Sequence, residues 1–129
     1  MRKKIISVFT ALLCVGMLAG CGKKTLEQKL GKSQLKEMND EAYNTYVKNG
    51  TDYKDIKIEV EGNNLYYKYW YNFELTDDMI AYLEKNSASI KSQIEPLKNN
   101  IKKECGVKPE KISYIFYDVN DEEVLRVEE

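Results

Sequence analysis

The sequence contains no histidine, and this absence removes several kinds of chemistry at once. Histidine is the commonest general base near neutral pH and the commonest zinc ligand, so catalytic triads that use it are excluded. Cysteine is also scarce, because Cys14 and Cys21 lie near the start of the chain and only Cys105 lies beyond them. An internal disulfide is therefore not expected in a domain that follows Cys21.

A strong charge of either sign is lacking as well. The 129 residues include 20 Lys and Arg against 21 Asp and Glu, a net charge of −1. Residues 1–20 hold three of the basic residues and no acidic residue, so the remaining 109 residues carry a net charge of −4. A nucleic-acid partner is not expected, because such partners select for concentrated positive charge. The remaining length suffices for one small domain with a single core.

The chain opens with a basic and then a largely apolar segment. Arg2, Lys3 and Lys4 precede apolar residues 5–19, which is the layout of a secretory signal, and the run is too short to span a bilayer. The run ends in Leu18-Ala19-Gly20-Cys21, and the whole arrangement resembles the precursors of bacterial lipoproteins. This resemblance implies cleavage before Cys21 and attachment of a diacylglyceryl group to that cysteine.

The resemblance therefore divides the chain into three parts. We expect residues 1–20 to be a lipoprotein signal peptide, residues 21–24 to be the lipidated cysteine with a short tether, and residues 25–129 to be a single α+β domain. The implied location is the extracytoplasmic face of the cell membrane, where the lipid on Cys21 anchors the protein.

The first part of the predicted domain is helical. Thr25-Leu26-Glu27-Gln28 fits a capping box, and Gly31 interrupts the helix that it opens. A second helical segment is predicted over residues 33–46, where apolar residues recur at spacings of three and four. A turn cluster at residues 49–52 ends this region.

A hairpin follows, because apolar and polar residues begin to alternate at Ile56. The predicted buried face contains Ile56, Ile58, Val60, Leu65, Tyr67, Tyr69, Tyr71 and Phe73. The loop is either Gly62-Asn63, which sets Lys57 opposite Lys68, or Asn63-Asn64, which sets Glu59 opposite Lys68 and Lys57 opposite Trp70. We favour Asn63-Asn64, because it pairs opposite charges. Both registers leave the same residues buried.

A long helix is predicted between this hairpin and a second one. Thr76 is its predicted N-cap and Gly106 its C-cap, and Pro96 predicts a kink near residues 93–96 because proline breaks the hydrogen-bond ladder. Its apolar stripe consists of Met79, Leu83, Ser87, Ile90, Ile94, Leu97, Ile101 and Cys105. The phase of Cys105 within this stripe predicts a buried, inert thiol.

The last strands are predicted over residues 112–118 and 123–127, around a turn at residues 119–122. The more apolar side holds Ile112, Tyr114, Phe116, Leu125 and Val127, although Ile115, Tyr117 and Val124 occupy the other side. The predicted fold class is α+β: an N-terminal helical segment followed by ββαββ, with an antiparallel sheet packed on a long kinked helix.

Several segments taken together resemble a family of small lipoproteins of clostridial type that is classed as a domain of unknown function. They are the lipobox, the Thr-Leu-Glu-Gln opening, the Glu-Gly-Asn-Asn-Leu-Tyr-Tyr-Lys-Tyr hairpin, the Cys-Gly-Val helix end and the final Tyr-Asp-Val-Asn-Asp-Glu-Glu-Val hairpin. One departure is Glu122, where relatives tend to have glycine. The resemblance implies a location and a fold, and it supplies no catalytic residues.

A candidate binding surface lies on the polar side of the first hairpin. Strand alternation places Tyr66, Lys68 and Trp70 on one face together with Lys57 and Glu59. Aromatic and charged side chains on an exposed sheet are suited to recognition of a peptide, a glycan or a protein. The alternative is that the helical segment at residues 33–46 covers this face.

Metal binding has one weak candidate. Asp118, Asn120 and Glu122 occupy positions one, three and five of a calcium loop, but the glycine at position six and the glutamate at position twelve are missing. An acidic hairpin turn is the simpler interpretation.

The sequence therefore predicts a lipid-anchored binding or accessory module with an unknown protein, peptide or glycan partner. The alternative is a structural subunit that docks onto a membrane complex through its sheet edges. An enzyme and a cofactor are not expected, because the pattern predicts convex faces and no catalytic set.

Overall fold

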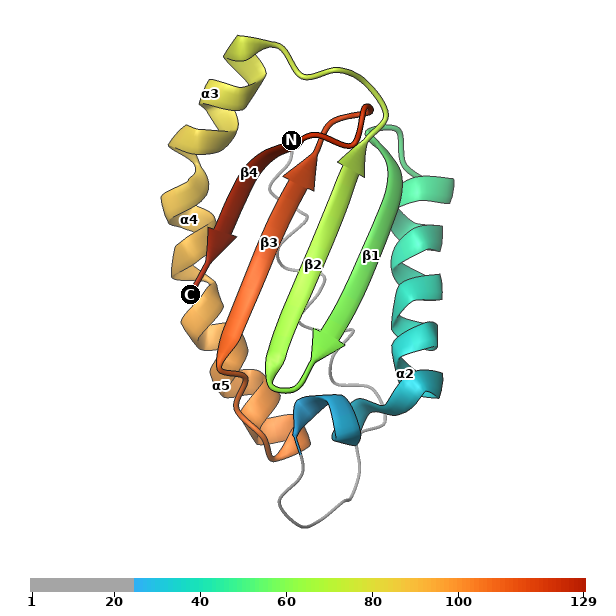
Figure 1. Cartoon of the computed structure of the whole chain (residues 1–129), viewed down its shortest axis with the longest axis vertical. Coiled ribbons are helices and arrows are strands. Elements are labelled where there is room, and N and C mark those ends of the chain that lie inside the picture. The colour runs from blue at the N-terminus through green and yellow to red at the C-terminus, as the bar shows by residue number, and fades with distance from the viewer. Residues whose placement is uncertain (1–24) are drawn as a thin grey trace.

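The computed structural model describes residues 25–129, so the predicted signal peptide, the lipid-attachment residue Cys21 and the tether at 21–24 lie outside the described residues. The fold is α+β, with helices beside a four-stranded sheet of order β1-β2-β3-β4 (Figure 1). The strands are β1 (Tyr53–Glu61), β2 (Asn64–Tyr71), β3 (Lys111–Tyr117) and β4 (Glu123–Glu128). The helices are α2 (Leu26–Ala42), the π-helix η1 (Tyr43–Lys48), α3 (Asp77–Lys85), α4 (Ser87–Ser92) and α5 (Ile94–Cys105).

The N-terminal helical region begins and breaks where the sequence predicts. The Thr25 hydroxyl accepts the amide of Gln28, and the Gln28 side chain accepts the amide of Thr25, which completes the capping box. Gly31 has φ +72° and ψ 164°, so the helix is kinked there by a conformation that favours glycine. The last turns before residue 49 wind as a π-helix, which the sequence did not indicate.

The long helix is bent, as predicted, but it is divided into three helices. The break at Gln93 confirms the kink expected near Pro96, which becomes the third residue of α5 and so falls in the first turn, where a missing amide is tolerated. A second break at Asn86 was not predicted; its side chain donates to the carbonyl of Tyr82 at 2.7 Å. Gly106 ends α5 with φ +84°, as expected.

The prediction of an antiparallel sheet is wrong, because β2 and β3 are parallel. Both hairpins are antiparallel, but α3, α4 and α5 carry the chain from the end of β2 back to the end where β2 begins. Parallel neighbouring strands require such a long crossover connection, which is usually helical. The sheet is therefore mixed, and its two central strands come from different hairpins.

The predicted register of the first hairpin is also wrong. Lys57 lies opposite Lys68 and Glu61 opposite Asn64, so the loop is Gly62-Asn63. Gly62 has φ +61°, which suits the first central residue of a tight hairpin turn. The like charges are separated by a diagonal contact, because Lys68 Nζ lies 2.8 Å from Glu59 Oε1.

Contacts from α2 hold this turn in place. The Glu27 amide donates to the Gly62 carbonyl at 2.9 Å, and the Gly62 amide donates to Glu27 Oε1 at 2.8 Å. The Leu26 amide donates to Asn63 Oδ1 at 2.9 Å. Turn geometry and tertiary docking therefore set the register, and the cross-strand charges adapt to it.

The core lies on one face of the sheet. The buried apolar residues of α2, α3, α4 and α5 join the same cluster as the predicted buried face of both hairpins, including Ile58, Tyr69, Tyr114 and Val127. The ambiguity of the second hairpin is thus resolved in favour of the Ile112, Tyr114 and Phe116 side. Met79 departs from the predicted stripe, since it is 42% exposed. We call the other side of the sheet the open face.

Candidate functional site

All five predicted surface residues lie on the open face. Lys57 and Glu59 come from β1, and Tyr66, Lys68 and Trp70 come from β2, where they alternate with buried core residues. The alternative that the helix covers them is wrong, because the buried side chains of α2 pack in the core on the opposite side. Among residues 25–129, none of the helices packs on the open face.

Charged side chains of β1 and β2 form an organised pair on this face. The Lys68 ammonium donates to Glu59, and this hydrogen bond is the main reason that the pKa of Lys68 lies above its ordinary value. Lys57 is exposed beside them. The Lys68 side chain is half-buried where it makes this contact.

Trp70 stacks on a residue that sequence reasoning did not include. The centroids of the Trp70 and Tyr117 rings lie 4.7 Å apart, and the angle between the ring planes is 11°. The two residues are direct neighbours in the parallel pairing of β2 with β3, and both are half-buried. Tyr117 was missed for two reasons. The buried side of β3 was ambiguous in the sequence, and the parallel pairing of β2 with β3 was not predicted.

β3 and β4 extend the polar part of the face. The Ser113 hydroxyl donates to Glu128 Oε1 at 2.7 Å, and this bond holds the pKa of the Glu128 carboxyl below its ordinary value. Arg126 contacts both Glu123 and Glu128, at 3.0 Å and 3.4 Å. Hydrogen bonds to these carboxylates, above all to Glu123, raise the pKa of Arg126 above its ordinary value. The open face therefore carries charges of both signs on the β1–β2 side and on β4.

One apolar residue anchors the centre of this face. Ile115 lies between Lys68 of β2 and Arg126 of β4 in the register, and it is 1% exposed. It does not belong to the core cluster on the other side of the sheet. Its register neighbours have long stems, and Lys and Arg side chains can cover apolar surface while their charged ends reach water.

The open face offers a flat aromatic pair beside fixed charges of both signs. A stacked Trp and Tyr pair presents ring surface to a planar or sugar ring, and the flanking Lys, Arg and Glu side chains can orient polar groups. Across residues 25–129, no group of three or more His, Cys, Asp and Glu side chains could hold a metal ion.

The calcium candidate is used for a different purpose in the structure. Asp118 is buried, and its Oδ1 accepts the amides of Asn120 at 2.8 Å and Glu122 at 3.1 Å. The Asn120 side chain donates to Glu74 at 3.2 Å. Asp118 therefore caps the turn between β3 and β4, and the geometry does not gather the three side chains around a common centre.

The remaining predicted position is Cys105, which is buried at the end of α5. This confirms the burial expected from its phase in the apolar stripe. Of the helices within the described part of the chain, none is both long and apolar enough to cross a membrane.

The described residues form a small α+β domain in which one sheet face is packed against helices and the other is open. The chain belongs to the family described as Domain of unknown function (DUF4854), which matches residues 23–128. No curated protein and no solved structure matches the chain.

Proposed function

We propose that this protein is a lipid-anchored binding module at the extracytoplasmic face of the cell membrane, and that the open face is its binding surface. The observation that carries the proposal is the Trp70–Tyr117 stack on a sheet face against which none of the described helices packs. The proposed anchor is the lipid on Cys21. The proposed role is non-catalytic and requires no cofactor.

The composition of the open face supports recognition of a polar partner. Large aromatic side chains dominate binding energy where they are rigid, and stacking on Tyr117 limits the rotation of Trp70. The Glu59–Lys68 pair fixes charges next to the stack in the same way. A protein, a peptide or a glycan could use such a surface, because each offers planar or ring groups flanked by hydrogen-bonding atoms.

The alternative role, a subunit that docks through the edges of the sheet, is less well supported. At the β1 edge, Asn39 of α2 bonds to both backbone groups of Ile58: its Nδ2 donates to the carbonyl at 2.9 Å and its Oδ1 accepts the amide at 2.7 Å. β4 carries Glu123, Arg126 and Glu128. Capped and charged edges resist the addition of another strand.

Anchoring is tested by replacing the acceptor cysteine. Cells that express the wild-type protein or Cys21→Ser are fed a fatty-acid analogue, and label in the protein is measured together with its membrane fraction. We expect the wild type to carry label and the variant to carry none, with Cys105→Ser as a matched control that keeps the label. Labelling of Cys21→Ser would contradict the proposed anchor.

Binding at the open face is tested by fluorescence, because Trp70 is the single tryptophan of the chain. Soluble cell-wall glycan fragments and tryptic peptides from the cell envelope are titrated as separate pools. A shift in Trp70 emission that Lys68→Ala weakens and Lys102→Ala leaves unchanged is the expected result. Lys102 is exposed on α5, so this control removes the same charge elsewhere. Unchanged emission with both pools, or equal shifts in both variants, would contradict the proposal.

A further inference from the structure

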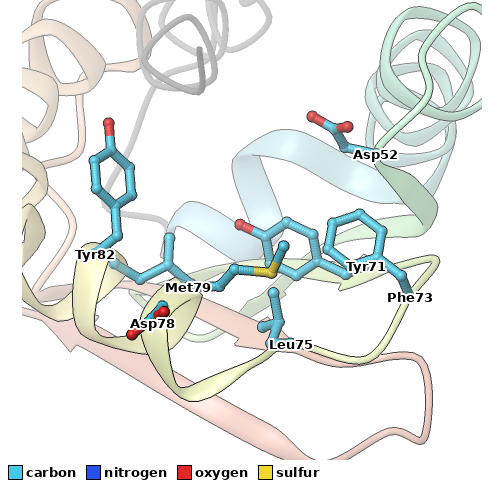
Figure 2. Close-up of a pocket in the computed structure, with 8 residues that line it drawn as sticks. Asp52, Tyr71, Phe73, Leu75, Asp78, Met79 and Tyr82 are labelled. Carbon is cyan, nitrogen blue, oxygen red and sulfur yellow. The ribbon is translucent and has the colours of Figure 1, made fainter.

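A pocket lies on the core side of the sheet, between the end of β2 and the start of α3. It has a volume of about 470 Å³ and is lined by Asp52, Tyr71, Phe73, Leu75, Asp78, Met79, Tyr82 and Leu83 (Figure 2). Its volume lies within the range of small-molecule sites. Tyr71 belongs to the core face of β2, so the pocket does not share the open face that carries the proposed function.

The pocket is lined chiefly by aromatic rings and aliphatic or thioether groups. Figure 2 shows the Met79 side chain extending along α3 toward Tyr71 and Leu75, while Tyr82 stands beside it with its hydroxyl pointing away. Met79 is 42% exposed and Tyr82 is 50% exposed, which is unusual for large apolar side chains of a helix. Their exposure is explained if they form the wall of a site that a ligand covers.

Among residues 25–129, the charged side chains that line the pocket are both acidic. They are Asp52 and Asp78, which lie on opposite sides of the pocket in Figure 2. Asp52 accepts the Thr51 hydroxyl at 3.3 Å. Rim carboxylates repel an anionic ligand and attract a cation, and the rings of Tyr71, Phe73 and Tyr82 present faces that bind organic cations.

We propose that this pocket binds a hydrophobic organic cation, such as an aryl or alkyl ammonium group. The apolar part of the ligand would lie against Met79, Leu75 and Phe73, and its positive charge would lie at the rim between Asp52 and Asp78. An uncharged apolar ligand would gain the same contacts but no attraction from the carboxylates. This proposal goes beyond the proposed function, and it holds or fails independently of the open face.

The test uses benzyltrimethylammonium as the probe and methionine methyl groups as the reporters. The full chain contains four methionines, so ¹³C-methyl labelling gives few signals, and Met79→Leu identifies the signal of Met79. Met38 is 2% exposed in the core and serves as the internal control for folding. We expect the cation to shift the Met79 signal in a saturable manner and to leave Met38 unchanged.

Ligand charge and protein charge are then varied separately. Benzyl alcohol and phenylacetate are the neutral and anionic controls, and we expect each to bind at least about threefold more weakly than the cation. Asp78→Asn should weaken binding of the cation about threefold, and the double variant with Asp52→Asn about tenfold. Asp77→Asn is the matched control, because Asp77 lies in the same first turn of α3 and does not line the pocket.

The outcomes separate clearly. A saturable Met79 shift that depends on Asp78 and not on Asp77 supports the site. The proposal is overturned by an absence of any Met79 shift, by equal binding of the neutral and cationic probes, or by equal effects of Asp77→Asn and Asp78→Asn. A variant that alters the Met38 signal is replaced by Asp78→Ser, so that a change in folding is not mistaken for a loss of affinity.

Discussion

The two faces of the sheet are built from alternating residues of the same strands, yet their interactions differ. On the core face Tyr67 stacks on Tyr114 and Tyr69 on Phe116, with ring centroids 5.0 Å and 4.9 Å apart. The open face has the Trp70–Tyr117 stack, and ion pairs surround it. The core rings are almost fully buried, whereas the open-face rings are half-buried.

Aromatic stacking therefore occurs in two different environments of the same sheet. The parallel register of β2 and β3 places aromatic residues side by side on both faces. In the core, burial raises the pKa of Tyr69 and Tyr114 well above the ordinary value, so their phenols stay neutral. On the open face the rings keep one side toward water. Core stacks therefore contribute stability, while the open stack remains accessible to a partner.

The largest expected effect compares adjacent residues of β2. Tyr69→Ala should lower the free energy of unfolding by about 3–5 kcal/mol, because a fully buried ring leaves a cavity. Trp70→Ala should cost about 1 kcal/mol, since this half-buried ring loses its stack and little burial. Urea denaturation followed by circular dichroism measures both. Equal losses for the two variants would contradict the distinction between the faces.

An intermediate loss of stability is expected at the β1 edge, where Asn39 occupies backbone groups that another strand could otherwise pair with. Asn39→Ala should cost about 1–3 kcal/mol, because the amide and carbonyl of Ile58 lose their partners. Glu37→Ala, on an exposed position of the same helix, is the control. Thermal unfolding gives the stability, and size-exclusion chromatography reports whether the uncapped edge causes association. A loss no larger than that of Glu37→Ala would mean that Asn39 does not protect this edge.

The smallest effect concerns a polar contact on the open face. Ser113→Ala should cost about 1 kcal/mol at pH 7, because the Glu128 carboxylate loses a hydrogen-bond donor. The pKa of Glu128 is lowered from 4.5 in the folded protein, so its contribution is present above that value and is lost as the pH falls through the folded pKa. The stability difference between wild type and Ser113→Ala should therefore shrink toward pH 3.

The control for this experiment is Glu128→Gln, which removes the titrating group. In that background the cost of Ser113→Ala should not vary with pH. A cost that stays constant from pH 7 to pH 3 in the wild-type background would assign the effect to the loss of the serine alone. The open face would then depend less on charge than the comparison of the two faces implies.

Local features were predictable where a few neighbouring residues decide them. The capping box at Thr25, the glycine ends at Gly31 and Gly106 and the break near Pro96 each follow from backbone geometry within one or two turns. Strand alternation identified the buried face of β1 and β2, because a period of two assigns each side chain to one face in either register. The five predicted surface residues were placed together for the same reason.

Features that depend on partners distant in sequence were not predictable. Tyr117 joined Trp70 only through the parallel pairing of β2 with β3, and the hairpin register depended on α2 docking against Gly62. The pocket was missed because Met79 fits the apolar stripe of the predicted helix and was expected to be buried. In the structure Met79 is exposed and lines the pocket near the start of α3.

The sequence by itself determined where the helical regions and strands lie, the helix ends at Thr25 and Gly106 and which side of the first hairpin is buried, because capping, proline and glycine geometry and side-chain periodicity act over short distances. Tertiary structure alone decided the mixed sheet, the register, the addition of Tyr117 to the open face and the acidic apolar pocket. Each of these requires segments far apart in the chain to meet, and contacts of that range depend on packing of the whole domain.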